Sequence, residues 1–181
     1  MGKTIRCKLV VVGDPAVGKT ALVQMFHSAG QRFPKHYMMT LGVEFCTKAV
    51  TTPDATTIVE FHLFDIAGQE IYAEIVPSFW EDTEAVMLVY DVTRAHTLEA
   101  CANWYGRLLQ SLGKDSLPGV LVANKMDLRE RLVVKRAEGQ QMAAQLGMAF
   151  HETSALDGQD IELPFQELAK LIHSGPVLDV E

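Results

Sequence analysis

The stretch Gly13-Asp14-Pro15-Ala16-Val17-Gly18-Lys19-Thr20 matches the phosphate-binding pattern G-x-x-x-x-G-K-[ST]. It follows residues 5–12, which are rich in Val, Leu and Ile and short enough for a buried strand. It precedes residues 21–26, whose apolar side chains recur at helical spacing. Because a phosphate-binding turn needs a strand before it and a helix after it, we interpret the stretch as a nucleotide-phosphate cradle. The alternative is a Gly-containing turn with a chance Lys-Thr pair.

Each part of this cradle has a predicted role. Gly13 and Gly18 let the backbone curl so that successive N–H groups point at phosphate oxygens, and the helix that opens near Gly18 adds the positive end of its dipole. Lys19 is expected to reach the β and γ phosphates, and the Thr20 hydroxyl to bind Mg²⁺. We therefore expect the whole stretch, together with the adjoining Ala21, to contact the nucleotide.

The overall composition predicts one globular domain over residues 1–181. The chain has 181 residues, of which 48% are hydrophobic and 22% are charged. Its net charge is −7 and it contains no block of Lys and Arg, which argues against nucleic acid or an anionic membrane as the main partner. The charge of a nucleotide must then be met by local groups.

Targeting signals and cysteine usage predict a cytosolic protein. The polar start at residues 1–4 has no secretory signal, and the longest strongly apolar stretch, residues 85–90, is too short to span a bilayer. The three cysteines lack C-x-x-C spacing, so neither a disulfide nor a zinc site is expected. Residues 174–181 contain no Cys that could carry a prenyl group, so no lipid anchor is expected if this end is the native one.

Strand and helix patterns alternate along the chain. They predict strands at residues 5–12, 43–49, 57–64, 85–91, 120–123 and 149–152, and helices at residues 21–26, 98–112, 137–146 and 165–172. A Pro53-Asp54 turn joins the second and third strands into a hairpin. Repeated strand–helix units predict an α/β fold: a mostly parallel six-stranded sheet with one antiparallel edge strand from the hairpin and helices on both faces. Ligands of such sheets bind at the carboxyl ends of the strands.

The sequence Asp65-Ile66-Ala67-Gly68-Gln69 follows the third predicted strand. A carboxylate at this strand end is expected to hold Mg²⁺ through a water, and Gly68 allows a backbone N–H to approach the γ-phosphate. Gln69 is then placed to orient an attacking water, which is the role described for the corresponding Gln of Ras-type enzymes. Taken alone, an exposed Asp-Gly turn would be the better interpretation. The order of this stretch after the phosphate cradle favours the catalytic one.

The sequence Asn124-Lys125-Met126-Asp127 follows the fifth predicted strand and indicates which base is bound. Asp127 can accept hydrogen bonds from N1–H and the 2-amino group of guanine, whereas adenine has no donor at either position. A buried carboxylate left without both bonds would reject the wrong base by about 10⁴-fold or more. Asn124 is expected to brace neighbouring loops and the Lys125 stem to pack over the base. The alternative is a solvated turn.

Two weaker signals complete the predicted site. After the last strand, the backbone N–H of Ala155 is our candidate for a bond to guanine O6, with Ser154 and Leu156 beside it, although Ser-Ala before a helix is also an ordinary loop. In the polar stretch before the hairpin, Thr40 can coordinate Mg²⁺ only when a γ-phosphate draws the loop inward, which would make this loop a switch. Phe33 is expected to pack on the base edge and Tyr37 to lie near the nucleotide; equally, both are loop aromatics anchored on the core.

In this order, the five motifs resemble the Ras superfamily of small GTPases over nearly the whole chain: GDPAVGKT, Thr40, DIAGQ, NKMD and ETSAL. This resemblance implies a P-loop small GTPase domain that binds GTP or GDP with Mg²⁺. Residues 41–45 and the aromatics before Asp65 and at 79–80 look like the Rab branch, whose effectors contact an aromatic surface. Phe45, Phe64 and Phe79 would form that surface here, or else belong to the hairpin core.

A closer resemblance is to the Rab-like GTPase of intraflagellar transport complex B. It rests on GDPAVGKTAL, the run at residues 37–45, the turn at 52–54 and residues 77–80. It implies a subunit of the ciliary train, paired with a small β-sandwich subunit and other subunits of complex B. It also implies a cytosolic protein of the cilium or flagellum and its base, held by protein contacts rather than by a lipid. An exchange factor and an activating protein are further expected partners.

The chain departs from the Rab pattern in two places. Residues 71–75 read Ile-Tyr-Ala-Glu-Ile where Rabs usually carry Arg and Phe, so ordinary Rab regulators are not expected to bind. Pro15 stands where Gly is common and where an activating protein's arginine approaches in Ras-like enzymes. Gln69 is retained, so hydrolysis remains chemically feasible.

Our leading hypothesis is a Mg²⁺-dependent GTP-binding switch with slow GTP hydrolysis, in which Lys19 and Gln69 act by charge stabilisation and positioning. Thr20, Thr40 and Asp65 are the expected metal ligands. The alternatives are a structural subunit that GTP stabilises without turnover, a membrane-trafficking Rab, which would need a C-terminal Cys, and a P-loop kinase. The guanine motif and Gln69 count against the kinase.

Overall fold

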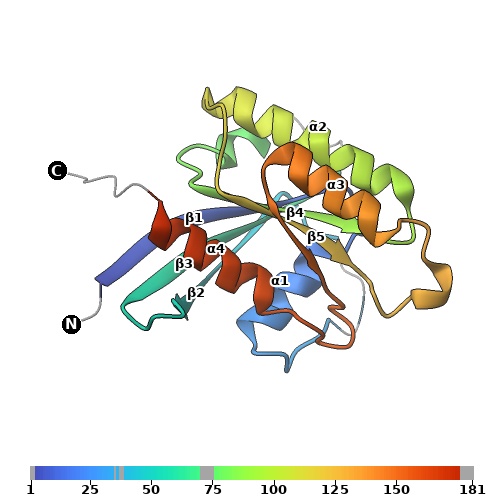
Figure 1. Ribbon diagram of the computed structural model, residues 1–181, viewed down its shortest axis with the longest axis horizontal. Coiled ribbons are helices and arrows are strands. Elements are labelled where there is room, and N and C mark those ends of the chain that lie inside the picture. The colour runs from blue at the N-terminus through green and yellow to red at the C-terminus, as the bar shows by residue number, and fades with distance from the viewer. Residues whose placement is uncertain (1–2, 35, 37–38, 70–75, 176–181) are drawn as a thin grey trace.

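The computed structural model describes residues 3–34, 36, 39–69 and 76–175. The predicted site residue Tyr37 and the unusual residues 71–75 therefore lie outside the described residues. The described part of the chain forms one six-stranded sheet with helices on both faces (Figure 1). The strands are β1 (Lys3–Val12), β2 (Val43–Thr51), β3 (Thr57–Ile66), β4 (Ala85–Asp91), β5 (Gly119–Asn124) and β6 (Ala149–Glu152). The helices are α1 (Lys19–His27), α2 (Ala95–Leu112), α3 (Arg136–Leu146) and α4 (Leu163–Ser174), with 3₁₀ turns η2 (Val76–Phe79) and η3 (Arg129–Arg131).

The strand order in the sheet is β2-β3-β1-β4-β5-β6. Only β2 runs antiparallel to its neighbour, and the other pairs are parallel. The α/β fold class predicted from the sequence is thus confirmed, including the antiparallel edge strand. The predicted bounds are correct to within a few residues; for example, α2 begins at Ala95 instead of Leu98, because polar residues in a helix's first turn carry no apolar signal.

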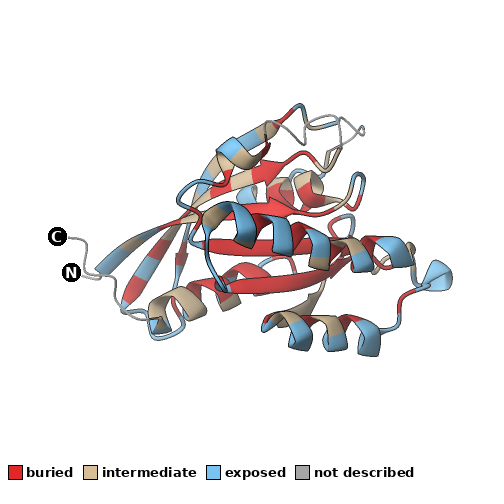
Figure 2. Cartoon of the chain, turned by 90° about the horizontal axis from the view of Figure 1, so that it is seen from above, coloured by how far each residue is buried: buried red, intermediate tan, exposed pale blue. Residues whose placement is uncertain are grey.

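Each face of the sheet packs against its own pair of helices. On one face, α1 and α4 meet through stacked rings of Phe26 and Phe165, whose centroids lie 3.5 Å apart. On the other face, α2 and α3 cover a cluster that includes Trp80 and Tyr90. Figure 2 shows the buried residues concentrated along the central strands, and every residue of β4 and β5 is buried. Two-sided burial explains why these strands read as continuous apolar runs.

Several side-chain predictions can be compared directly with this core. The apolar stripes of α2 and α4 face the sheet, as their spacing predicted. Among the three aromatics of the expected effector surface, Phe45 is 55% exposed, while Phe64 and Phe79 pack in part against the core. In the described ranges, no helix is long and apolar enough to cross a membrane.

His151 on β6 gives the fold a predictable response to pH. Its Nε2 is buried and has no hydrogen-bond partner among the described residues. Burial lowers the pKa of His151 below 6.5, although Glu167 and Asp160 oppose this shift. Below pH 6.5 the unfolded chain therefore binds a proton that the folded chain resists, and stability falls as the pH decreases. We expect His151→Leu to reduce this loss, measured by urea unfolding between pH 7.5 and 5.5.

The matched control is His96→Gln, because His96 is exposed on the first turn of α2. This variant should keep the pH dependence of the wild type. An unchanged slope in His151→Leu would show that the burial of His151 carries no pH-dependent penalty.

Candidate nucleotide-binding site

The predicted phosphate cradle is the turn between β1 and α1 at the carboxyl edge of the sheet. The ammonium group of Lys19 donates to the carbonyl oxygens of Gly13 and Asp14 at 2.8 and 2.9 Å. Lys19 is only 6% exposed. Its burial lowers its pKa to about 8, against the opposing effect of the nearby Asp65 and Asp14 charges. A buried cation held only by neutral carbonyls has a strong electrostatic preference for an incoming phosphate.

The outer side of the cradle is held by two residues that were not predicted from the sequence to belong to the site. Trp104 of α2 donates its Nε1–H to Asp14 Oδ1 at 3.0 Å, and Arg94 donates from Nη2 to the Pro15 carbonyl at 3.0 Å. The side chain of Asp14 is therefore turned toward α2. The backbone N–H of Asp14 can contribute to phosphate binding, whereas Pro15 has no N–H to donate. The Asp14 carboxylate and the Pro15 carbonyl hold the turn in place.

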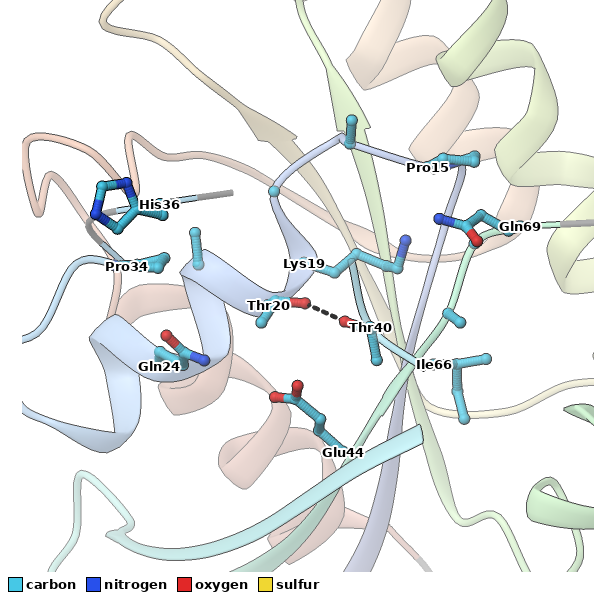
Figure 3. A pocket seen from close by; sticks show the side chains of 15 residues that line it. Pro15, Lys19, Thr20, Gln24, Pro34, His36, Thr40, Glu44, Ile66 and Gln69 are labelled. Carbon is cyan, nitrogen blue, oxygen red and sulfur yellow. Dashed lines mark hydrogen bonds between the residues drawn. The ribbon is translucent and has the colours of Figure 1, made fainter. Parts of the chain in front are cut away.

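The three predicted metal-binding residues lie together beside Lys19. The Thr20 and Thr40 hydroxyl oxygens are 2.8 Å apart, and Thr20 donates to Asp65 Oδ2 in a short hydrogen bond. Thr40 Oγ1 also lies 3.5 Å from that carboxylate oxygen. Figure 3 shows Thr20 and Thr40 pointing toward each other next to Lys19. The structure thus brings two hydroxyls and a carboxylate, which are oxygen ligands of the kind that Mg²⁺ prefers, to one point.

The state of Asp65 supports a cation at this position. Its side chain is 1% exposed and its Oδ1 has no hydrogen-bond partner among the described residues. Burial raises the pKa of Asp65 to about 6, while the Thr20 hydrogen bond and the Lys19 charge act in the opposite direction. An unpaired buried carboxylate oxygen is costly on its own. The residues present therefore fit a divalent cation, which would satisfy this oxygen.

The segment after β3 lies directly against the phosphate cradle. A Cβ added at Gly68 would be 2.4 Å from the Gly13 carbonyl oxygen and 2.7 Å from the Pro15 nitrogen. Only glycine permits this approach of two backbones. Gln69 follows and lines, with Lys19, a cavity of about 390 Å³ (Figure 3). The catalytic pair predicted from the sequence thus shares one cavity.

Asn124 connects the cradle to the predicted base-recognition motif. It is 1% exposed, and its Nδ2 donates to the Val17 carbonyl at 3.0 Å. Its Oδ1 accepts from Thr153 Oγ1 and from the Ala155 N–H, both at 3.2 Å. The Ala155 N–H, which the sequence suggested for guanine O6, is thus engaged by Asn124 here. The predicted bracing role of Asn124 agrees with these contacts across three loops.

The remaining residues of the base motif form a charged network. Asp127 Oδ1 accepts from Ser154 Oγ at 2.7 Å. Lys125 Nζ lies 2.7 Å from Asp91 Oδ2, and the same oxygen accepts from Arg94 Nε at 3.1 Å. Although burial alone would raise the pKa of Asp91, bonds from Lys125 and Thr93 lower it below its usual value. Asp91 thereby joins the Lys125 loop to the Arg94 that holds the phosphate cradle.

The structure separates the predicted site into a phosphate half and a base half. The cavity is lined by the predicted residues Pro15, Ala16, Gly18, Lys19, Thr20, Ala21, Thr40, Gly68 and Gln69, and by others that the sequence did not indicate, including Gln24, Pro34, His36 and Glu44. The predicted base-binding residues lie outside this lining, and the Asn124–Val17 hydrogen bond joins them to the cradle. They are Asn124, Lys125, Asp127, Ser154 and Ala155. Phe33 is 39% exposed and Leu156 is 55% exposed, and neither lines the cavity.

Some of the missed residues had a detectable signal. Asp91 is the last residue of a buried strand, and polar residues at that edge are candidates in any parallel sheet. Trp104 carried no such signal, because its apolar neighbours on α2 place it in the core stripe. The position of Glu44 depends on the register of the β2–β3 pair, which the sequence does not specify.

The fold carries a phosphate cradle, an acid–hydroxyl cluster and a base motif at one edge of its sheet, and this combination defines a P-loop nucleotide-binding protein. The chain belongs to the Ras family, whose model matches residues 8–174. It is similar to intraflagellar transport protein 27 homologues. The Bos taurus homologue is 41% identical over 169 residues, which cover 93% of this chain and 91% of that protein. The Trypanosoma brucei brucei homologue is 42% identical over 166 residues, covering 92% and 89%.

Two further relatives set this likeness in context. Intraflagellar transport protein 27 of Chlamydomonas reinhardtii is 41% identical over 92% of this chain and 83% of its own length. Ras-related protein Rab7 of Drosophila melanogaster is 34% identical over 90% of this chain and 78% of its own length. The resemblance to a Rab-like GTPase of intraflagellar transport, stated from the motifs, is therefore confirmed.

Proposed function

We propose that this chain is a Mg²⁺-dependent guanine-nucleotide switch that hydrolyses GTP slowly and serves as a subunit of the intraflagellar transport particle. The observation that carries the proposal is the cluster of Thr20, Thr40 and Asp65 beside the buried Lys19. All of residues 1–181 would form one GTPase domain. The Ras-family match and the names of the relatives support the nucleotide class and the transport role.

The residues on the phosphate side have distinct roles in this proposal. The Lys19 ammonium group exchanges its hydrogen bonds to the Gly13 and Asp14 carbonyls for bonds to phosphate oxygens. It then stabilises the negative charge that develops on these phosphate oxygens. Thr20, Thr40 and Asp65 would hold Mg²⁺. The bound ion would neutralise negative charge on the β and γ phosphate oxygens. Gly68 brings the backbone that precedes Gln69 against the cradle, and the Gln69 amide orients the attacking water.

The base side selects and retains guanine. Asp127 accepts from the base, and its bond from Ser154 orients the carboxylate. Lys125 covers the base with its stem while Asp91 holds its ammonium group. Asn124 fixes the base side relative to the phosphate cradle through its hydrogen bond to the Val17 carbonyl.

Intrinsic hydrolysis should be slow. Among the described residues that line the cavity there is no arginine, and Arg94 is engaged by Asp91 and the outer side of the cradle. An arginine supplied by an activating protein is worth about 10³ to 10⁵ in rate. We therefore propose that an activating protein and an exchange factor set the cycle, and that protein contacts, including a small β-sandwich subunit of complex B, hold the chain in the cilium or flagellum.

Replacement of Gln69 tests hydrolysis directly. The purified chain is loaded with GTP, and the conversion of bound GTP to GDP is followed over hours. We expect measurable conversion in the wild type and a rate at least about tenfold lower in Gln69→Leu, because the attacking water is no longer oriented.

Gln24→Leu is the matched control, since Gln24 lines the same cavity from α1 (Figure 3). It should hydrolyse GTP as the wild type does. If the wild type keeps GTP intact for as long as Gln69→Leu, the nucleotide acts as a structural ligand in the isolated chain and the hydrolysis proposal fails there.

A further inference from the structure

Glu44 faces Asp65 directly across the β2–β3 pair. The two residues are partners in the antiparallel register. Side chains of directly opposite residues point to the same face of a sheet, with Cβ atoms about 5 Å apart. On this face Lys48, four residues further along β2, reaches α1 at the Phe26 carbonyl. Glu44 and Asp65 therefore both lie on the side of the sheet that α1 covers.

The Glu44 carboxylate is directed at the phosphate half of the site but has no partner there. No hydrogen bond or ion pair joins it to any of the described residues. It lines the 390 Å³ cavity and also an adjoining cavity of about 270 Å³ that contains Asp65. Figure 3 shows it pointing from β2 toward Thr20 and Gln24 of α1. An unpaired carboxylate thus extends toward the cluster that holds the orphaned Asp65 Oδ1.

Two carboxylates in this arrangement repel each other when nothing lies between them. Like charges placed directly opposite on neighbouring strands destabilise a sheet. The same placement becomes favourable when a divalent cation is present, because both charges then attract it. Without the cation, the repulsion destabilises the folded chain around Glu44 and Asp65. With the cation bound, the attraction stabilises it. Both effects make the stability of this region more dependent on the cation.

We propose that Glu44 is a second acidic group of the cation site, a positioning residue that attracts the ion held by Thr20, Thr40 and Asp65 through the water molecules that Mg²⁺ keeps. The inference rests on the proposed function, since it concerns the same site. Glu44 is the second residue of β2 and follows Thr40 by four residues. Its charge therefore ties the start of β2, and the loop before it, to the presence of the cation.

The test measures the Mg²⁺ concentration that the protein needs to retain its nucleotide. Dissociation of a fluorescent GDP analogue is followed over a series of free Mg²⁺ concentrations. We expect Glu44→Gln to raise the Mg²⁺ concentration for half-maximal retention about 3- to 10-fold. Its dissociation rate in EDTA should equal that of the wild type, because no cation is then present to attract. Glu44→Asp, which keeps the charge, should remain near the wild-type midpoint.

Glu60→Gln is the matched control. It removes the same charge from β3, but Glu60 lies five residues before Asp65 and hence on the opposite face of the sheet. It should leave the Mg²⁺ midpoint unchanged. A second readout is thermal unfolding of the nucleotide-free protein in EDTA, in which Glu44→Gln should melt at a higher temperature than the wild type, whereas Glu60→Gln should not.

The outcomes separate this inference from the proposed function. A Glu44→Gln midpoint within twofold of the wild type, or the same shift in Glu60→Gln, overturns the role of Glu44. Failure of Glu44→Gln to raise the melting temperature in EDTA contradicts the repulsion with Asp65. If the wild type itself retains GDP equally well with and without Mg²⁺, the proposed Mg²⁺-dependent function fails irrespective of Glu44.

Discussion

Replacing Asn124 by alanine is expected to raise the rate of guanine-nucleotide dissociation by about 100-fold or more. The side chain makes three buried hydrogen bonds, to the Val17 carbonyl, Thr153 Oγ1 and the Ala155 N–H. Alanine would leave these groups without their partner. Each unsatisfied buried group costs about 1–3 kcal/mol, and about 1.4 kcal/mol corresponds to a factor of ten. Part of the loss should appear as lower stability of the nucleotide-free protein.

The geometry around Asn124 makes the effect specific to its amide. A Cβ at Gly18 would lie 2.3 Å from Asn124 Nδ2, so the amide packs directly against Gly18. Asn124→Asp keeps the acceptor for Thr153 and Ala155 but removes the donor to Val17. The new carboxylate would be buried with one oxygen facing the Val17 carbonyl oxygen, so this variant should both lose fold stability and release nucleotide faster than the wild type.

Dissociation of a fluorescent GDP analogue and urea unfolding measure these two effects separately. Asn103→Ala is the matched control, because Asn103 is exposed on α2 and should tolerate the same truncation. If Asn124→Ala released GDP at a rate within threefold of the wild type, the bracing role of Asn124 would be wrong.

Replacing Gly68 by alanine should both destabilise the chain and slow GTP hydrolysis. The added Cβ would meet the backbone at 2.4 Å from the Gly13 oxygen and 2.6 Å from the Asp14 carbon. Neither atom is the end of a flexible side chain, so the two segments must separate. Forcing an atom into such a packed contact costs about 1–3 kcal/mol. Because Gln69 is the next residue, separation would also move the amide that orients the water, and we expect GTP turnover to fall at least as far as in Gln69→Leu.

Unfolding in urea and single-turnover GTP hydrolysis together check this prediction. Gly106→Ala is the control: Gly106 lies within α2, and a Cβ there meets no atom within 4 Å. That variant should gain up to about 1 kcal/mol in stability from helix propensity and hydrolyse GTP normally. Wild-type stability and turnover in Gly68→Ala would mean that the close approach of the two backbones is not needed.

The sequence predicted the fold class because its signals are local. The buried strands read as apolar runs, the helices α2 and α4 show a periodic stripe, and the phosphate pattern lies between a strand and a helix. The predicted bounds differ by up to three residues, and the largest difference is at the start of α2, whose first turn has no periodic apolar signal.

The candidate site was predictable residue by residue but not as a set of contacts. The sequence indicated Thr20 from the phosphate pattern, Thr40 from the loop before the hairpin and Asp65 from its strand end. The structure brings these three together. The sequence did not indicate that the Ala155 N–H is engaged by Asn124, because that bond depends on how two loops meet. Tyr37 lies outside the described residues and stays a prediction.

What the sequence alone determined is the identity of the chemical groups and the strand ends that carry them, since both follow from short spacings along the chain. What only the tertiary structure decided is which groups face one another. Trp104 reaches Asp14 across 90 residues, Asn124 reaches Val17 across 107, and Glu44 meets Asp65 through the register of two strands. These pairings are set by strand order, register and helix packing, because a contact between distant segments depends on how all the intervening elements assemble and not on local spacing.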